Sequence, residues 1–556
     1  MRLTASVRPG TQSAGYAVGR APVRPGTQSV GYAVGRAPVR PGTQSVGAIA
    51  CDSMGNDQVA DVMVVGAGNA ALCAALSAHE QGATVLVLEA APREQRGGNS
   101  RFSGGIFRFA HDGLDHLRPL LTEEGARWVD RVTVAPYEPQ RFAADIDLVC
   151  QGRSDPELFS TLIETSYDTV AWMQGYGVRW ELVVDKLFDP AKLPAGETYA
   201  VPPGGAVRAT NEGIGLMYDL FNAVEQAGIE VRYDSPVQEL LFEGSRCVGA
   251  KVRDADGFTE LRASSVVLGS GGFESNPELR LRYLGEGWDL VKVRGTRFNM
   301  GHVLMNALAS GAAPSGHWGG AHASPLDAHA PDVGELSLTD RMSRYSYPYC
   351  LLVDRDGKRF VDEGEDEVWL TYAKTGWAIR AQQGARAWQI FDQRTIHLLE
   401  PRYSTGIPVQ ADTLEDLAAK LGISADGLRA TVDEFNAACA DDAGFDAFRK
   451  DGLRTAAPDQ PVKSNWGQPI DRPPYVAYAV TCGITFTYGG LKIDRRARVH
   501  DTVGRPMGGL YATGEIAGGF FYHNYAAGSG LMRGATFGRI AGREAAELSL
   551  GRNADD

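Results

Sequence analysis

Residues 61–98 read DVMVVGAGNAALCAALSAHEQGATVLVLEAAPREQRGG, and this stretch decides the fold. Residues 62–65 form a short apolar run with the character of a buried strand, and a Gly66-Ala67-Gly68 turn follows. An alanine-rich helix is predicted from Asn69 to about Gln81. A second apolar strand, residues 84–88, ends on Glu89. Strand, turn, helix and strand in this order form the βαβ unit that binds dinucleotides, here as G-x-G-x-x-A.

Each position of this unit has a physical role. Gly66 permits the turn, Gly68 lets the backbone approach a pyrophosphate, and Ala71 lets the helix pack close to the strand. The helix begins with free N–H groups and the positive end of its dipole, which favour phosphate. Glu89 lies 23 positions beyond Gly66, where an acidic side chain accepts hydrogen bonds from an adenosine ribose. The sequence therefore predicts a bound dinucleotide.

Composition limits the class of protein. The chain has 556 residues, enough for two or three domains, and a net charge of −13 that argues against a nucleic-acid partner. No apolar run approaches the roughly 20 residues that span a bilayer. The seven cysteines form no C-x-x-C pair, so they are interpreted as reduced thiols of a cytoplasmic protein and no metal site is expected.

Residues 1–53 are not expected to belong to the fold. RPGTQSAGYAVGRAPV, which begins at Arg8, recurs as RPGTQSVGYAVGRAPV at Arg24 and starts again at Arg40. This Pro- and Gly-rich repeat offers little to bury, so it is predicted to be disordered. It could imitate a transit peptide, but translated repetitive DNA before a start at Met54 is favoured. Its six arginines and one aspartate carry +5, which leaves −18 for the remaining chain.

The rest of the chain alternates loops, helices and strands. RGGNSRFSGG, residues 96–105, is a glycine-rich loop in which backbone would meet the second half of a long cofactor. Helices are predicted at 155–174, 412–421, 424–439 and 530–548. Strands are predicted at 228–233, 237–242, 249–254, 265–268, 491–493 and 510–512.

Seven motifs together carry a resemblance to a known family. In chain order they are GAGNAA, LEAAPREQRGGNS, SSVVLGSGGFESN, GKRFVDE, GGLKID, LYATGEIAGG and ATFGRIAG. The chain from about residue 57 to 547 resembles the FAD-dependent fumarate reductase and succinate dehydrogenase flavoproteins. RGTRFNMG, DEGED and GITFTYGGLK make it most similar to the tricarballylate dehydrogenase subfamily.

The resemblance implies a fold class: an α/β, Rossmann-like FAD-binding domain in two sequence segments, with an inserted α+β capping domain. The expected boundaries are a disordered repeat tail at 1–53, the first FAD-binding segment at 54–274, the cap at 275–481 and the second FAD-binding segment at 482–556. The last helix would begin near the flavin, where its dipole stabilises the negative charge of the reduced ring.

Non-covalent FAD is the implied cofactor, because the loop Ser103–Gly104–Gly105 lacks the histidine to which succinate dehydrogenases attach theirs. No metal is implied. The predicted cofactor-binding residues are Gly66, Gly68, Asn69, Ala70, Ala71, Glu89, Gly97, Gly98, Asn99, Ser100, Ser103, Gly104, Gly105, Val237, Gly271, Gly272, Gly514, Glu515, Ser529, Gly530 and Leu531.

Candidate catalytic residues follow from the motifs and from departures within them. AHAS, residues 321–324, is similar to the family's Q-x-H-P-T and makes His322 a candidate carboxylate ligand. The catalytic arginine is replaced by Glu367, and the H-H-T-M-G-G segment by TFTYGG at 485–490. The arginine of N-R-L-G-G is replaced by Tyr525. Arg297, Thr485 and Tyr525 complete the candidate set, with Arg341, Arg344 and His523 as further cations; the catalytic base stays open.

These departures argue against ordinary fumarate reduction and favour a desaturase. The expected function is FAD-dependent desaturation of a di- or tricarboxylate, with tricarballylate to cis-aconitate as the leading case. The expected partners are a small carboxylate and an external electron acceptor such as a quinone or a membrane-associated redox protein. Two alternatives stay open: a ketosteroid Δ1-dehydrogenase-like flavoenzyme, and an electron-transfer subunit without its own small substrate.

Overall fold

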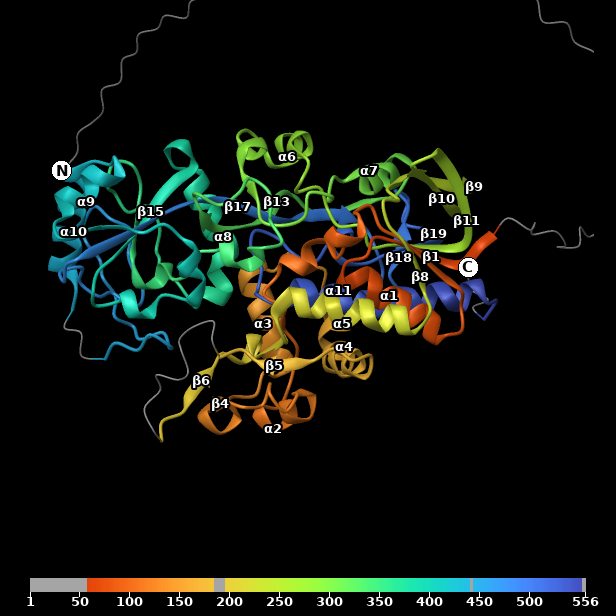
Figure 1. Ribbon diagram of the computed structural model, residues 1–556, viewed down its shortest axis with the longest axis horizontal. Helices are drawn as coiled ribbons and strands as arrows, with labels where there is room; N and C mark the ends of the chain where they lie inside the picture. Colours follow the sequence, from red (N-terminus) through yellow and green to blue (C-terminus); the bar gives the residue numbers. More distant parts are fainter. Residues whose placement is uncertain (1–57, 185–195, 441–443, 553–556) are drawn as a thin grey trace, which may run out of the picture. The chain divides into compact units, whose positions relative to one another are not determined.

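The computed structural model describes residues 58–184, 196–440 and 444–552. Residues 55–556 form one compact unit. The predicted repeat tail, residues 1–53, and Cys51 lie outside the described residues. All further description concerns the unit formed by residues 55–556 (Figure 1).

The βαβ unit has the predicted form. Strand β1 (Gln58–Val65) pairs in parallel with β2 (Val85–Leu88), and α1 (Asn69–Glu80) connects them. Val62, Met63 and Val64 are fully buried because β1 lies inside the sheet, between β2 and β11. Parallel strands buried on both faces need a continuous apolar run, which is what the sequence supplies.

The first sheet has eight strands in the order β18-β19-β10-β11-β1-β2-β8, with β9 paired to β10. Strand β19 comes from the far end of the sequence and pairs in parallel with β11, for example Val266 with Leu510. The bounds of the remaining strands of this sheet are β8 Glu230–Arg232, β9 Val237–Glu243, β10 Arg246–Asp254, β11 Gly257–Leu268, β18 Arg498–His500 and β19 Pro506–Ala512.

Helix α11 (Ser529–Ser549) packs along α1, and the two lie side by side in Figure 1. The close approach depends on small residues. A Cβ on Gly538 would lie 2.4 Å from the carbonyl oxygen of Ala70, and a Cβ on Gly542 would lie 2.1 Å from that of Ala74. Larger residues at these two positions would therefore separate the helices.

The second sheet has six strands and is built by the inserted segment. Its order is β12-β17-β15-β14, and β13 and β16 also pair with β17. The long antiparallel ladder between β13 and β17 sets His322 opposite Phe486. The bounds are β12 Lys292–Val293, β13 Pro314–Asp327, β14 Leu351–Val353, β15 Arg386–Phe391, β16 Val409–Ala411 and β17 Tyr475–Leu491.

The predicted helical pair next to this sheet is confirmed as α9 (Leu414–Leu421) and α10 (Ala425–Ala438). Thr413 and Ser424 cap them by accepting the backbone N–H groups of Asp416 and Gly427, both at 3.1 Å. The other helices are α2 Leu114–Leu117, α3 Pro139–Cys150, α4 Pro156–Gly175, α5 Glu212–Gln226, α6 Pro277–Leu284, α7 His302–Ala309 and α8 Val368–Arg380. One small sheet contains β3 Ile106–Phe107, β5 Trp180–Leu182 and β7 Val207–Ala209. Another contains β4 Val132–Val134 and β6 Tyr199–Val201.

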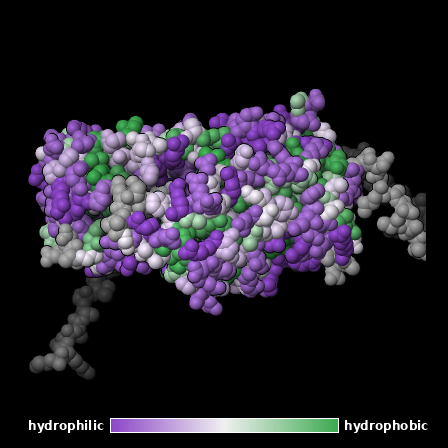
Figure 2. Space-filling model, turned by 60° about the horizontal axis from the view of Figure 1, so that its bottom comes forward, coloured by the Kyte–Doolittle hydropathy of each residue, from purple (hydrophilic) through white to green (hydrophobic). Residues whose placement is uncertain are grey.

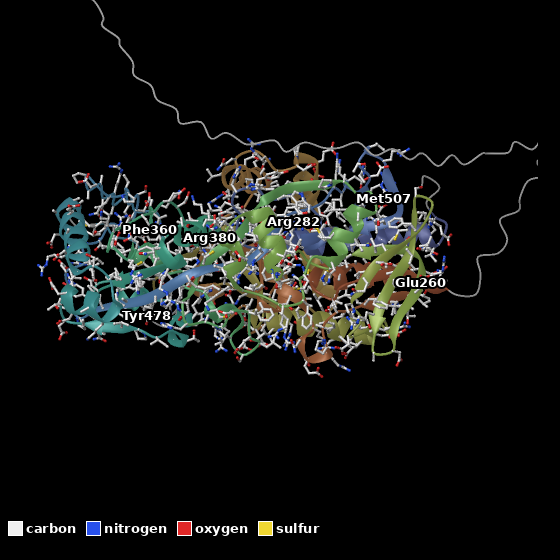
Figure 3. All side chains as sticks on the ribbon, turned by 90° about the horizontal axis from the view of Figure 1, so that it is seen from above. Glu260, Arg282, Phe360, Arg380, Tyr478 and Met507 are labelled. Carbon is white, nitrogen blue, oxygen red and sulfur yellow. The ribbon has the colours of Figure 1, made fainter. Side chains whose placement is uncertain are left out.

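The predicted fold class is confirmed, because two sequence-distant segments complete one sheet and the segment between them builds another. Figure 3 shows Glu260 and Met507 with the first sheet, whereas Phe360 and Tyr478 lie with the second. The exact domain boundaries stay a prediction, and the one expected at 481/482 falls within β17.

The surface shows no single dominant apolar region on the face drawn in Figure 2, where hydrophilic side chains surround small hydrophobic patches. Large exposed hydrophobic side chains come from separate elements, such as Leu148 of α3 and Phe258 of β11. Within the described ranges, no helix has the length and hydropathy to cross a membrane. Six cysteines in those ranges are free thiols.

Candidate active site

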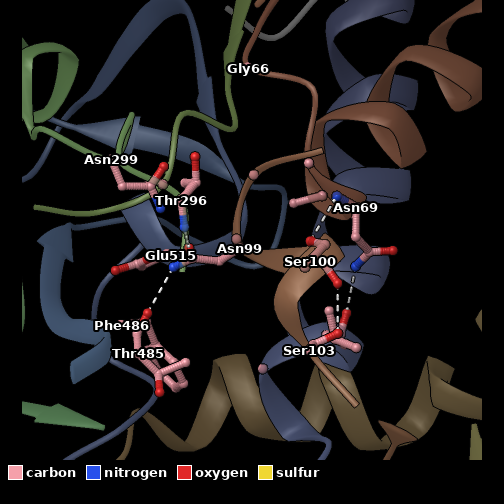
Figure 4. Close-up of a pocket in the computed structure, with 18 of the residues that line it drawn as sticks. Gly66, Asn69, Asn99, Ser100, Ser103, Thr296, Asn299, Thr485, Phe486 and Glu515 are labelled. Atoms are coloured by element: carbon pink, nitrogen blue, oxygen red, sulfur yellow. Dashed lines mark hydrogen bonds between the residues drawn. The ribbon is translucent and has the colours of Figure 1, made fainter. Parts of the chain in front are cut away.

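One large cavity is lined by both parts of the structure. The βαβ turn, the 98–105 loop and the start of α11 contribute from the first part. Strands β13 and β17 and the short helices η8 (Thr339–Met342) and η12 (Pro401–Thr405) contribute from the inserted segment. Figure 4 shows Asn69, Ser100 and Ser103 on one side of it, and Thr485, Phe486 and Glu515 on another.

Most of the residues predicted from the sequence line this cavity. They are Gly66, Gly68, Asn69, Ala70, Glu89, Gly98, Asn99, Ser100, Ser103, Gly104, Gly105, Val237, Gly271, Gly514, Glu515, Gly530 and Leu531, together with His322, Thr485 and Tyr525.

Four predicted cofactor residues do not line the cavity but support residues near it. Ala71 packs against Gly269, where an added Cβ would lie 2.8 Å from the Ala71 Cβ. Gly97 makes the left-handed turn into the loop (φ 109°), and a Cβ on Gly272 would lie 2.0 Å from Glu515 Oε1. Ser529 is fully buried, and its hydroxyl donates to the carbonyl of Ala526 at 2.6 Å.

The start of α1 is open for an anionic ligand. Its N-cap is Gly68, which offers no side-chain cap to the first N–H groups of the helix. The Asn69 N–H donates to Ser100 Oγ at 3.1 Å, and Asn69 Nδ2 donates to the carbonyl of Leu531 at 2.9 Å. Asn69 therefore ties the glycine turn to both the loop and α11. A pyrophosphate at this helix end fits these donors.

Glu89 provides a buried acceptor. Its Oε1 atom accepts the N–H of Ala91 at 2.8 Å, and the side chain lines the cavity. Burial raises the pKa of Glu89, and the backbone N–H groups of Ala91, Ala67 and Ala90 oppose that rise. The position and chemistry fit an acceptor for ribose hydroxyls.

Asn99 joins the loop to the inserted segment. Its Nδ2 atom donates to the carbonyl of Thr485 at 2.7 Å, and its Oδ1 atom accepts the N–H of Thr296 at 2.9 Å (Figure 4). The loop that follows the βαβ unit is thereby fixed against β17. This contact brings the predicted cofactor residues and the predicted catalytic Thr485 to one site.

His322 lies in an aromatic enclosure. Its ring centroid is 4.9 Å from that of Tyr372 and 5.2 Å from those of Phe486 and Tyr525. Burial, and next the charge of Arg294, hold the pKa of His322 well below its usual value. The imidazole is therefore neutral at neutral pH. His322 lines the cavity, but it cannot serve there as a cation.

Tyr525 has an unusual hydrogen-bonding arrangement. Its hydroxyl oxygen accepts the backbone N–H groups of Gly528 at 2.9 Å and Gly530 at 3.2 Å, at the start of α11. Burial raises the pKa of Tyr525, and those two N–H groups, Arg108 and Arg533 oppose the rise. Because the raised pKa keeps the hydroxyl protonated, its hydrogen can be donated toward the cavity.

The cations of the cavity were not the ones expected from the sequence. Arg294, Arg402 and Arg533 line it. Arg294 and Arg402 both pair with Asp340, the latter at 3.1 Å, and Arg402 also pairs with Glu400 at 2.8 Å. Arg294 Nη1 donates to Thr485 Oγ1 at 3.1 Å.

The pKa values of these arginines shift in different directions. Burial would lower the pKa of Arg294, but Tyr345 and Asp340 outweigh burial and raise it. Burial lowers the pKa of Arg533 to about 10. All three guanidinium groups are therefore protonated at neutral pH. Arg294 lies within the RGTRFNMG segment, three residues before the predicted Arg297.

Arg297 is the prediction that the structure corrects. Its side chain is exposed and does not line the cavity, whereas Arg294, three residues earlier, is buried in it. Arg341 is also exposed. Arg344 is buried but pairs with Asp327 at 2.5 Å, and His523 lies against His317, 4.8 Å between ring centroids. None of these four is a cavity-lining cation among the described residues.

Four features together define a flavoprotein oxidoreductase. They are the βαβ unit, the helix start without a side-chain cap from Gly68, the buried acceptor for the ribose, and the second sheet that closes the cavity. Residues 61–531 match the family described as FAD binding domain. The chain belongs to this family, and its cofactor is FAD.

Several relatives have known identities. The chain is 28% identical to a probable fumarate reductase, Ifc3, of Shewanella frigidimarina, over 89% of this chain and 76% of that protein. It is 26% identical to the 3-oxosteroid 1-dehydrogenase of Mycobacterium tuberculosis, over 86% of this chain and 97% of that protein. It spans about half of two other relatives, 50% and 52% of their lengths.

Among solved structures, the open conformation of a flavocytochrome c3 fumarate reductase is similar, with a TM-score of 0.64 and 26% identity. The match covers 89% of this chain and 79% of that one. The prediction of an FAD-dependent oxidoreductase of the fumarate reductase and succinate dehydrogenase type is confirmed.

Proposed function

We propose that the protein desaturates a saturated carboxylate, converting a CH–CH unit to C=C, with tricarballylate to cis-aconitate as the leading case. The observation that carries this proposal is the pair Arg294 and Arg402 around Asp340, next to His322 and Tyr525 in the cofactor cavity. Guanidinium groups are the strongest neutral-pH partners for carboxylates. FAD would supply the hydride acceptor when bound, and the hydrogen on the neighbouring carbon would leave as a proton.

The roles of the chain's own residues follow from their contacts. Thr485 accepts from Arg294 and thereby orients the guanidinium, whose Nε atom is buried without a protein partner in the described structure. Tyr525 donates its hydroxyl hydrogen to a substrate oxygen. The Tyr525 hydroxyl oxygen is not free to accept, because it already accepts two backbone N–H groups. His322 acts as a neutral hydrogen-bonding group rather than a charged clamp.

The remaining parts of the proposal concern the cofactor and the electrons. FAD is held without a covalent bond, because Ser103, Gly104 and Gly105 line the cavity and offer no histidine. The electrons leave to an external acceptor, either a quinone or a membrane-associated redox protein. An electron-transfer subunit without its own substrate would not need the arginine and tyrosine groups that surround the cavity.

A second candidate is a 3-oxosteroid dehydrogenase-like activity on a less polar ring. Tyr345, Trp369, Tyr372 and Phe486 give the same cavity an aromatic wall. The likeness to the mycobacterial 3-oxosteroid 1-dehydrogenase also extends over almost all of that protein. The guanidinium donors of Arg294 and Arg402 in the same cavity favour the carboxylate.

Oxidation of tricarballylate and of its trimethyl ester, with an artificial electron acceptor, tests the proposal. The acid should be oxidised and the ester should react at least 10-fold more slowly, because it cannot pair with Arg294 and Arg402. Equal rates for acid and ester would contradict a carboxylate clamp. Oxidation of a 3-oxosteroid, with no reaction of any carboxylate in a panel of di- and tricarboxylates, would support the second candidate instead.

A further inference from the structure

Two glutamates, one fully buried and one half-buried, lie beside the cofactor cavity. Glu274, in the GGFESN segment after β11, is completely inaccessible, and Glu515 lies in the short helix η13 (Gly514–Ile516). Their side chains are hydrogen-bonded to each other. Two ionised carboxylates cannot form such a bond, because neither has a hydrogen to donate. One of the two therefore holds a proton.

The remaining contacts decide which one. Glu274 Oε1 accepts from Asn99 Nδ2 and from Asn299 Nδ2, both at 2.5 Å. Its other oxygen, Oε2, has no donor among the described groups. Glu515 Oε1 instead accepts the N–H of Thr487 at 2.8 Å and its hydroxyl at 3.1 Å. Glu515 has the donors that a carboxylate needs, whereas Glu274 Oε2 needs a proton of its own.

The charged groups that face the pair differ between its two members. On the Glu515 side, Arg533 of α11 contributes a favourable charge. On the Glu274 side, Arg280 of α6 donates to the backbone carbonyl of Glu274 at 2.5 Å. Burial, and then the charge of Glu515, hold the pKa of Glu274 well above its usual value.

We propose that Glu274 is permanently protonated and donates to the Glu515 carboxylate, so that this singly charged pair fixes Asn99 and Glu515 in place against FAD. Asn99 and Glu515 line the cavity (Figure 4), and Glu274, which does not line it, contacts both. Glu274 is therefore a positioning residue. The arrangement places one negative charge instead of two beside a flavin that becomes more negative on reduction. The inference does not depend on which substrate is oxidised.

Paired substitutions test this assignment. Gln is a close mimic of protonated Glu274, since its amide can donate to Glu515 while its oxygen accepts from Asn99 and Asn299. For Glu274→Gln we expect an FAD dissociation constant within about twofold of the parent and an unchanged flavin midpoint potential. Glu274→Leu and Glu515→Gln should each weaken FAD binding at least 10-fold, since each leaves buried polar groups unpaired.

Two outcomes would overturn the proposal. A silent Glu515→Gln together with a damaged Glu274→Gln would put the proton on Glu515. Parent-like FAD binding in Glu274→Leu would show that the pair positions nothing. Infrared spectra of holoprotein labelled with ¹³C-glutamate give a readout that does not depend on the Leu variant folding. The parent should show a protonated carboxyl band that does not titrate across the neutral range and is absent from Glu274→Gln, and its absence from the parent would contradict the proposal.

Discussion

Arg294 and Arg402 share the carboxylate of Asp340, and this sharing controls how much positive charge the cavity offers. Three arginines line the cavity, but so do the acids Glu89, Asp340 and Glu515. Affinity for a carboxylate then depends on donor geometry rather than on net charge. The sequence indicated the RGTRFNMG segment as cationic but could not show that Arg294 points inward and Arg297 outward. In a loop without helical or strand periodicity, no pattern distinguishes the two.

Replacing Arg294 by Gln should raise KM and lower turnover for the carboxylate substrate. The loss of one charge-assisted hydrogen bond, roughly 1.5–3 kcal/mol, corresponds to about a 10- to 100-fold fall in kcat/KM. FAD content should be unchanged. Arg344→Gln is the matched control, because Arg344 is equally buried and ion-paired but outside the cavity. Steady-state kinetics of both variants decide the matter, and an equal effect on KM in the two would refute the clamp.

His322 should make the fold less stable as the pH falls. Its folded pKa is depressed by burial, so below its ordinary pKa of about 6.5 the unfolded chain binds a proton that the folded chain does not. Stability attributable to His322 is thus present above that pKa and is lost as the pH drops below it. Between neutral and mildly acidic buffer, we expect the melting temperature of His322→Gln to fall by less than that of the parent. Parallel melting curves for parent and variant would contradict a neutral, buried His322.

At the scale of secondary-structure elements, the βαβ unit and the β13–β17 ladder together form the site. The βαβ unit was predicted almost to the residue, since its strand, turn and helix are specified by local sequence. The β13–β17 ladder, which sets His322 opposite Phe486, was not predicted. Its strands are separated by more than 140 residues of sequence, and β13 begins PSGHWGG, which has little strand character. Long-range pairing of this kind leaves no local periodic signal.

The turn between β1 and α1 should tolerate no side chain. A Cβ on Gly66 (φ 100°) would lie 2.5 Å from the carbonyl oxygen of Gly269, whereas one on Gly82 (φ 88°) would meet nothing within 4 Å. Gly82→Ala should therefore cost only backbone strain, roughly 1–2 kcal/mol. Gly66→Ala should cost more and also lose FAD. Melting temperature and bound flavin after purification measure both effects, and equal losses in the two variants would show that the turn is not closely packed.

For the whole molecule, the order of motifs correctly predicted an α/β FAD-binding fold in two segments. The sequence could not identify the substrate end of the cavity, because it is assembled from β13, β17, η8 and η12, which meet only in the folded chain. Buried pairing, such as Arg294 with Asp340 or Glu274 with Glu515, is likewise a property of the packed structure.

Removing residues 1–53 should leave melting temperature and flavin content unchanged. Every residue that lines the cavity lies in the unit formed by residues 55–556. Thermal melts and flavin absorbance of the full and shortened chains give the comparison. Acid precipitation of either protein should release the flavin into the supernatant, since the proposed attachment is non-covalent. A lower melting temperature after truncation would assign the tail a structural role, and flavin retained in the pellet would indicate a covalent bond.

The central claim, that this flavoprotein withdraws a hydride from a carboxylate, is tested most directly by anaerobic reduction of the bound flavin. Holoprotein is mixed without any acceptor with tricarballylate, with other di- and tricarboxylates, or with a 3-oxosteroid, and the flavin absorbance is followed. The account predicts that a carboxylate, with tricarballylate foremost, bleaches the flavin in the parent and does so at least 10-fold more slowly in Arg294→Gln. Bleaching by the steroid alone, or by no compound in the panel, would contradict it.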